Sequence, residues 1–145
     1  RSLLDRGFTL VFLGGKDDLQ DTEEVISLLP SSFHKKIINR VGSTTLKEAA
    51  RILSGCRVFI SGDSALMHLA AAVETPTISL FGPTDPRMLA PRGKEHAQLF
   101  SSTRCSGCQL PSYEFVAVCR NGGHIQDISV SDVLEKLRDL RVLLS

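Results

Sequence analysis

Residues 61–86 have the sequence SGDSALMHLAAAVETPTISLFGPTDP, and they guide the interpretation of the rest of the chain. The apolar run 58–60 stops where this stretch begins, and an alanine-rich segment follows. A second apolar run, 77–81, then leads into a turn rich in Gly and Pro. Strand, helix and strand within about 30 residues are typical of a βαβ unit. Ligands of such units usually bind where the first strand ends and the helix begins. We therefore expect this stretch to form the floor of a binding site.

The same alternation extends over the first hundred residues. Apolar runs predict strands at 8–13, 36–39, 57–60, 77–81 and 98–100. Helical patterns occur at 16–29, 45–54, 64–73 and 129–145, with the stripe of the central helix formed by Leu66, Leu69, Ala70 and Val73. Strands that alternate with helices predict an α/β fold, a Rossmann-like open parallel sheet with flanking helices.

Three local signals refine this prediction. The run 8–13 is continuously apolar, which suits a strand buried on both faces, and Gly7 before it is placed to cap a helix. Thr45 and Glu48 match a capping box at the start of a helix. Cys56 follows that helix and is interpreted as a small core residue.

Length and composition indicate one globular domain without nucleic-acid partners. The chain has 145 residues, 42% of them hydrophobic, and a net charge of +1. We predict a single domain made of a βα core (1–100), a Cys-containing loop (101–128) and a closing helix (129–145). No apolar run reaches the ~18–20 residues of a membrane span, no signal-peptide pattern is present, and four cysteines are too few for a disulfide scaffold. A cytoplasmic location is therefore expected.

The start of the central helix has the chemistry of an anion site. The backbone N–H groups of its first turn have no partners within the helix, and the helix dipole favours negative charge there. Ser64 and His68 are one turn apart and share a face, while Asp63 can accept hydrogen bonds from sugar hydroxyls. Each also has a purely structural interpretation: Ser64 as an N-cap, Asp63 as a turn residue, His68 as a packing residue. The motif G-x-G-x-x-G is absent, so a nicotinamide or flavin dinucleotide site is not supported.

A family resemblance adds to this interpretation. The pattern D-S-x-L-M-H-x-A-A-A at 63–72, followed by P-T-I-S-L-F-G-P-T-D-P at 76–86, closely resembles the signature of the bacterial heptosyltransferases, glycosyltransferase family 9. These are ADP-heptose:lipopolysaccharide transferases, and the heptosyltransferase II branch is the most similar. The likeness covers essentially the whole chain.

The resemblance implies a GT-B fold, two Rossmann-like domains with the active site between them, of which this chain looks like most of the carboxyl-terminal, donor-binding domain. It implies that the residues 63–68 contact the donor's diphosphate and sugar, and that Thr44 lies near the nucleoside. The full set implied in donor binding is Gly15, Lys16, Thr44, Gly62, Asp63, Ser64, Ala65 and His68. The donor would be ADP-heptose-like, and the reaction an inverting transfer that needs no metal or other cofactor.

The resemblance also limits the expected activity. The family usually has Gly where this chain has Ala65, a residue whose backbone meets the phosphate. The family's catalytic carboxylate and its site for the lipopolysaccharide-core acceptor belong to an amino-terminal domain, and a Lys-containing loop precedes the segment that begins at Arg1. None of these is present, so we expect no catalytic residue in this chain and no transfer by it alone. A stand-alone nucleotide-sugar-binding module or a non-catalytic fragment remains the alternative. Self-association through an exposed apolar edge, and peripheral attachment to the inner membrane through the full-length enzyme, are further expectations.

The cysteine loop suggests a metal site. Cys105, Cys108, Cys119 and His124 could bind zinc tetrahedrally, and the chain would then be a small zinc-stabilised domain. A Cys105–Cys108 disulfide and reduced structural cysteines are the alternatives.

Overall fold

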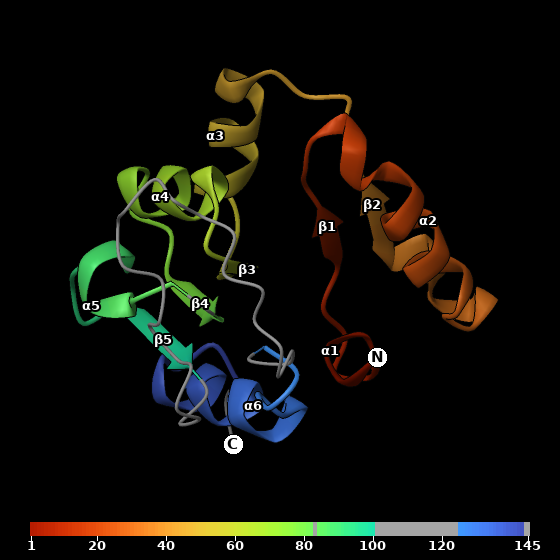
Figure 1. Cartoon of the computed structure of the whole chain (residues 1–145). Helices are drawn as coiled ribbons and strands as arrows, with labels where there is room; N and C mark the ends of the chain where they lie inside the picture. Colours follow the sequence, from red (N-terminus) through yellow and green to blue (C-terminus); the bar gives the residue numbers. More distant parts are fainter. Residues whose placement is uncertain (83, 101–124, 144–145) are drawn as a thin grey trace, which may run out of the picture. The chain divides into compact units, whose positions relative to one another are not determined.

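The computed structural model describes residues 1–82, 84–100 and 125–143 and contains two compact units, Arg1–Ala49 and Ala50–Ser145 (Figure 1). Each unit is described by itself. Both units lie within the single domain that the sequence predicts, and that domain assignment stays a prediction. In the described part of the chain, no helix is both long enough and apolar enough to cross a membrane.

The first unit is built around two parallel strands. Its elements are α1 (Ser2–Asp5), β1 (Leu10–Phe12), η1 (Lys16–Asp18), α2 (Leu19–Ser27), η2 (Ser31–Lys36) and β2 (Ile37–Asn39). β1 pairs with β2 in parallel, with Leu10 opposite Ile37. Gly7 follows α1 with φ +89° and donates its N–H to the Leu4 carbonyl at 3.0 Å. The predicted helix cap is therefore confirmed, since few other residues adopt this φ without strain.

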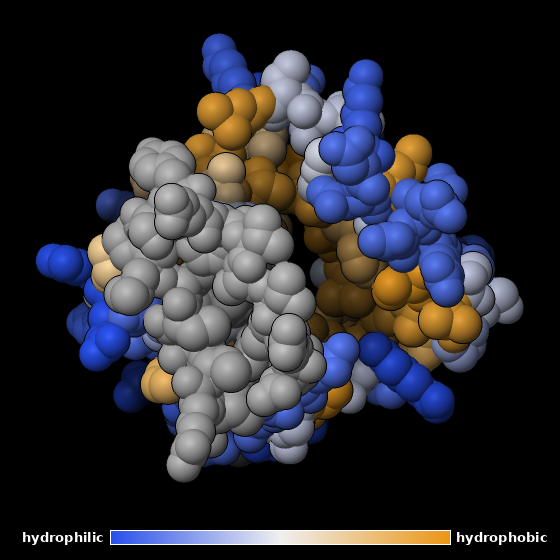
Figure 2. All heavy atoms as spheres, viewed as in Figure 1, coloured by the Kyte–Doolittle hydropathy of each residue, from blue (hydrophilic) through white to orange (hydrophobic). Residues whose placement is uncertain are grey.

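The prediction that β1 is buried on both faces is wrong. All three of its residues are half-buried, and α2 contains no buried residue. Val25 is 49% exposed and Leu28 78% exposed, and Figure 2 shows hydrophobic surface over the α2–η2 part of this unit. A strand of three residues paired with a second short strand shields only part of each side chain, so continuous hydrophobicity alone did not predict burial.

The second unit contains a three-stranded, all-parallel sheet. Helix α3 (Leu46–Ser54) leads into it, and its own elements are β3 (Phe59–Gly62), α4 (Ala65–Ala72), β4 (Thr77–Phe81), α5 (Pro86–Leu89), β5 (His96–Phe100) and α6 (Val130–Asp139). The strand order is β3-β4-β5. α4 packs on β3 and β4, α6 packs on β4 and β5, and the two helices lie on either side of the sheet in Figure 1. β3 ends two residues later than predicted, so Gly62 belongs to the strand.

The buried face of α4 also differs from the predicted stripe. Met67 and Ala70 are fully buried, whereas Leu66, Leu69 and Val73 are only half-buried. Met67 and Ala70 are three residues apart and lie on one face, and this face is the one that the sheet covers. The sequence could not indicate which side of an almost uniformly apolar helix would face the sheet.

A buried hydrogen bond joins the ends of α3 and α4. Thr75 follows α4, is 3% exposed, and its hydroxyl donates to the Leu53 carbonyl at 2.7 Å. The chain reaches this point through Glu74, whose φ of +61° lies in the left-handed region. This turn ends α4 and directs the chain into β4.

Candidate functional site

The turn between β3 and α4 positions the residues predicted from the central motif. Gly62 is the last residue of β3, and Ser64 is the N-cap of α4 with extended backbone (φ −150°, ψ 160°). The Ser64 hydroxyl oxygen accepts a hydrogen bond from the Met67 N–H at 3.3 Å. The N-cap interpretation of Ser64 is thus confirmed, and this cap is a neutral hydroxyl in a helix whose first turn contains no acidic residue.

Two backbone donors remain open at this helix start. Within the described residues, the N–H groups of Ala65 and Leu66 have no acceptor. Ala65 is exposed and Leu66 is half-buried, so an external group can reach this turn. Open N–H groups at the positive end of a helix favour an anion such as phosphate.

His68 and Asp63 flank these donors as exposed side chains. His68 lies one turn after Ser64, and its neighbour Met67 takes the buried position instead. The interpretation of His68 as a packing residue is therefore wrong. Asp63 has no hydrogen-bond partner among the described residues, so the structure does not use it to close the turn.

The start of α3 differs from that of α4 because it carries its own carboxylate. Glu48 accepts hydrogen bonds from the N–H and the hydroxyl of Thr45, both at 2.8 Å, and the Glu48 N–H donates back to the Thr45 hydroxyl at 3.3 Å. The predicted capping box is confirmed. The hydrogen bonds from the Thr45 backbone and side chain hold the pKa of Glu48 below its ordinary value. The carboxylate of Glu48 places negative charge in the first turn of α3, which makes this helix start less favourable for an external anion.

The turn after β1 is closed in a similar manner. Asp18 accepts a hydrogen bond from the Gly15 N–H at 2.8 Å. A predicted ligand of the donor, the Gly15 backbone, is therefore already bonded within the protein.

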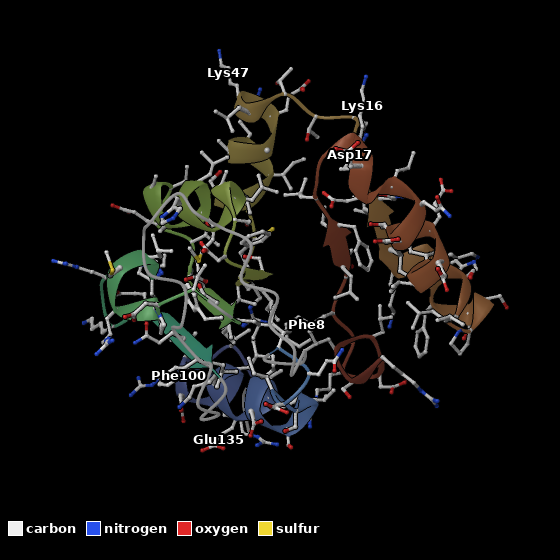
Figure 3. The ribbon with its side chains drawn as sticks, in the orientation of Figure 1. Phe8, Lys16, Asp17, Lys47, Phe100 and Glu135 are labelled. Carbon is white, nitrogen blue, oxygen red and sulfur yellow. The ribbon has the colours of Figure 1, made fainter. Side chains whose placement is uncertain are left out.

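Gly15, Lys16 and Thr44 nevertheless share one edge of the β1–β2 sheet. The Gly42 N–H donates to the Gly14 carbonyl at 3.0 Å, and a Cβ on Gly42 would stand 3.2 Å from the Lys16 Cα. The segment after β2, which leads to Thr44, therefore lies against the turn after β1. Lys16 is exposed and points outward in Figure 3, and Thr44 is half-buried. The eight predicted residues thus form two groups, one in each unit.

The sequence interpretation did not single out an ion pair at the start of α5. Asp85 caps this helix by accepting the Arg87 N–H at 2.9 Å. Its carboxylate also accepts hydrogen bonds from the Arg87 guanidinium, through Nη2 at 2.6 Å and Nε at 3.0 and 3.1 Å. These bonds lower the pKa of Asp85 and raise that of Arg87. The available signal was the spacing of two residues between opposite charges after a strand.

The predicted zinc ligands cannot be placed. Cys105, Cys108, Cys119 and His124 all lie outside the described residues. Within the described ranges, no group of three or more His, Cys, Asp or Glu side chains could hold a metal ion.

Cys56 is half-buried, its thiol donates to the Ile52 carbonyl at 3.3 Å, and burial raises the pKa of this thiol. Cys56 is therefore only partly covered, and its interpretation as a core residue is not confirmed.

A parallel sheet with flanking helices and an open helix start at its carboxyl edge places the chain in the class of α/β proteins. Residues 1–114 match the model of glycosyltransferase family 9 (heptosyltransferase), and the chain belongs to this family.

Curated relatives agree with this assignment. The chain is 32% identical over 144 residues to lipooligosaccharide heptosyltransferase 2 of Haemophilus influenzae, a match that covers 95% of this chain and 39% of the relative. It is 31% identical over 91 residues to lipopolysaccharide heptosyltransferase 2 of Escherichia coli, covering 63% of this chain and 26% of the relative. The chain therefore spans well under half the length of these relatives.

Solved structures confirm the fold class. ADP-heptose lipopolysaccharide heptosyltransferase II of E. coli matches with a TM-score of 0.78 at 26% identity, over 97% of this chain and 38% of that chain. A family 9 glycosyltransferase of Veillonella parvula also matches with a TM-score of 0.78, at 24% identity, over the same shares of the two chains. The Rossmann-like parallel arrangement of GT-B glycosyltransferases is thus present here.

Proposed function

We propose that this chain binds the nucleotide-sugar donor of an inverting heptosyltransferase, with ADP-heptose or a close analogue as the donor. The observation that carries the proposal is the open start of α4, where a neutral Ser64 cap leaves the N–H groups of Ala65 and Leu66 without acceptors in the described part of the chain. Membership of the heptosyltransferase family supports the choice of a sugar nucleotide as the anion.

The proposed chemistry uses these groups to stabilise the leaving diphosphate. An acceptor hydroxyl attacks the anomeric carbon of the heptose, the bond from that carbon to the diphosphate oxygen breaks, and the electron pair stays on this oxygen. The helix start and His68 bind the negative charge that develops there. The acceptor proton passes to a general base, and we assign that base to no residue of this chain.

The remaining predicted residues receive supporting roles. Asp63 binds hydroxyl groups of the sugar, and Gly62 leaves room for the ligand because it has no side chain. Gly15, Lys16 and Thr44 are proposed to contact the nucleoside and its phosphates. The Ala65 methyl group stands at the first residue of α4, and its N–H stays available for a phosphate oxygen.

The experiment is a titration of the isotopically labelled chain with nucleotide diphosphates, followed by the backbone amide shifts. ADP is expected to shift the amides of residues 62–68 at lower concentration than UDP does. A chain whose amides respond equally to both, or only to UDP, would exclude an adenine nucleotide as the donor. No response to any nucleotide diphosphate would refute donor binding.

A second measurement tests the alternative, a stand-alone or non-catalytic module. The chain is incubated with ADP-heptose and a lipopolysaccharide-core acceptor, and sugar transfer is measured. Transfer by the chain alone would refute the alternative. A zinc site in the cysteine loop, self-association and a cytoplasmic or membrane-peripheral location stay predictions.

A further inference from the structure

The Asp85–Arg87 ion pair lies at the same sheet edge as the start of α4. β3 and β4 are hydrogen-bonded neighbours in parallel, with Gly62 opposite Leu80. Asp63 and Ser64 follow directly after β3, and the turn that leads to Asp85 follows directly after β4. Since parallel neighbours end at the same edge of a sheet, both turns emerge side by side.

Charge balance at this edge singles out Arg87. Between residues 58 and 91, Arg87 is the one Lys or Arg in the sequence, whereas Asp63, Glu74 and Asp85 carry negative charge. A bound diphosphate brings further negative charge, and His68 is cationic only when it is protonated. Permanent positive charge from this segment can therefore come from Arg87 alone.

The ion pair presents the guanidinium in a fixed orientation. Asp85 binds Nε and Nη2 of Arg87, so the Nη1 amino group is turned away from the carboxylate. The Asp85 side chain is 15% exposed and the Arg87 side chain 85% exposed, so the carboxylate anchors a group that faces solvent. A planar guanidinium held on one side is well suited to bind phosphate oxygens on the other.

We infer that Arg87, positioned by Asp85, is a further diphosphate-binding residue of the donor site. This inference rests on the proposed function and adds a cation from the strand next to the α4 turn. Arg87 binds the diphosphate electrostatically and through its outward N–H groups, and Asp85 is a positioning residue that does not touch the ligand.

The test compares ADP and adenosine by isothermal titration against the intact chain and its variants. Arg87→Ala is expected to weaken ADP binding about tenfold and to leave adenosine binding unchanged. Arg87→Lys should recover part of the ADP affinity, because it keeps the charge without the planar fork. Asp85→Asn should lower the ADP affinity less than Arg87→Ala does, because the guanidinium stays but loses its anchor. Arg138→Ala on α6, another exposed arginine, is the matched control and should bind ADP like the parent chain.

The outcomes distinguish this inference from the proposed function. If the parent chain binds ADP and Arg87→Ala binds it equally well, the role of Arg87 is refuted and donor binding stands. If Arg87→Ala weakens ADP and adenosine alike, or Arg138→Ala weakens ADP as much, the effect is not specific to the diphosphate and the inference is also refuted. If the parent chain binds no ADP, the proposed function fails and this inference fails with it. Thermal unfolding of each variant measures whether loss of the Asp85–Arg87 pair changes the stability of the protein. Exposed ion pairs contribute little to stability, so only a small change is expected.

Discussion

The starts of α3 and α4 are capped by different groups. Each helix begins after a parallel strand with backbone N–H groups that need acceptors. At α3 the chain supplies a carboxylate, Glu48, which bonds to Thr45. At α4 it supplies only the neutral Ser64 hydroxyl. The two helix starts therefore differ in charge: Glu48 places a carboxylate in the first turn of α3, whereas the first turn of α4 contains no acidic residue and is the more favourable of the two for an anion.

The largest expected effect tests the packing of α4 on the sheet. Met67→Ala removes a fully buried side chain from α4 and should lower the free energy of unfolding by about 3 kcal/mol. Chemical denaturation measures this loss. Leu66→Ala, at a half-buried neighbour, should cost clearly less. Equal losses for the two variants would contradict the assignment of the Met67 face as the face that packs on the sheet.

The second prediction adds a carboxylate at the start of α4, where the chain has none in the first turn. Ser64→Asp keeps an N-cap acceptor but places a carboxylate where the diphosphate is proposed to bind. ADP affinity should fall about a hundredfold through charge repulsion, while stability is maintained. Titration calorimetry and thermal unfolding measure the two properties. Ser64→Thr is the neutral control. Unchanged ADP binding by Ser64→Asp would contradict the proposal that the diphosphate binds at the start of α4.

The third prediction concerns the capping box at the start of α3. Thr45→Ala removes the hydroxyl that takes part in the capping box and should lower the free energy of unfolding by about 1 kcal/mol. ADP binding at the α4 turn should not change. A loss of stability together with a loss of ADP affinity would show that the two helix starts are not independent.

The fourth prediction concerns pH and the same capping box. Because the pKa of Glu48 is lower in the folded chain than in an unfolded one, Glu48 stabilises the fold above its unfolded pKa, and this contribution is lost as the pH falls through its folded pKa. The parent chain should therefore lose more stability than Glu48→Gln on acidification from neutral pH. Denaturation curves of both proteins across this range measure the difference, and parallel losses would contradict it.

The smallest expected effect lies at the end of α4. Glu74 adopts φ +61°, and the Thr75 N–H donates to the Ala70 carbonyl at 2.9 Å, as in a Schellman turn. Glu74→Gly should raise the free energy of unfolding by about 0.5 to 1 kcal/mol, because glycine adopts this φ without strain. Thermal unfolding detects the change. Ala72→Gly, at the last residue of α4, should not stabilise the protein, because Ala72 does not have a positive φ.

Local chemistry made several features predictable from the sequence. The capping box at Thr45, the N-cap at Ser64, the helix end at Gly7 and the strand 77–81 each depend on residues within four positions of one another. The motif at residues 63–72 was specific enough to indicate the family, which the comparison with known proteins confirmed. Each of these signals depends on residues close together in the sequence, so it can be interpreted without knowing which elements pack against it.

Burial and side-chain partnership could not be predicted in this way. An apolar run at 8–13 and an alanine-rich helix both lack a pattern that distinguishes one face from another, so half-burial of β1 and full burial of Met67 depended on the neighbouring elements. The Asp85–Arg87 pair required the turn after β4 and the geometry of α5. Sequence chemistry therefore specified the order of most helices and strands, the helix caps and the family, whereas β1, β3 and β5 each begin two residues away from the predicted position. Only the packing of distant segments specified which side chains are covered, because burial depends on neighbours far away along the chain.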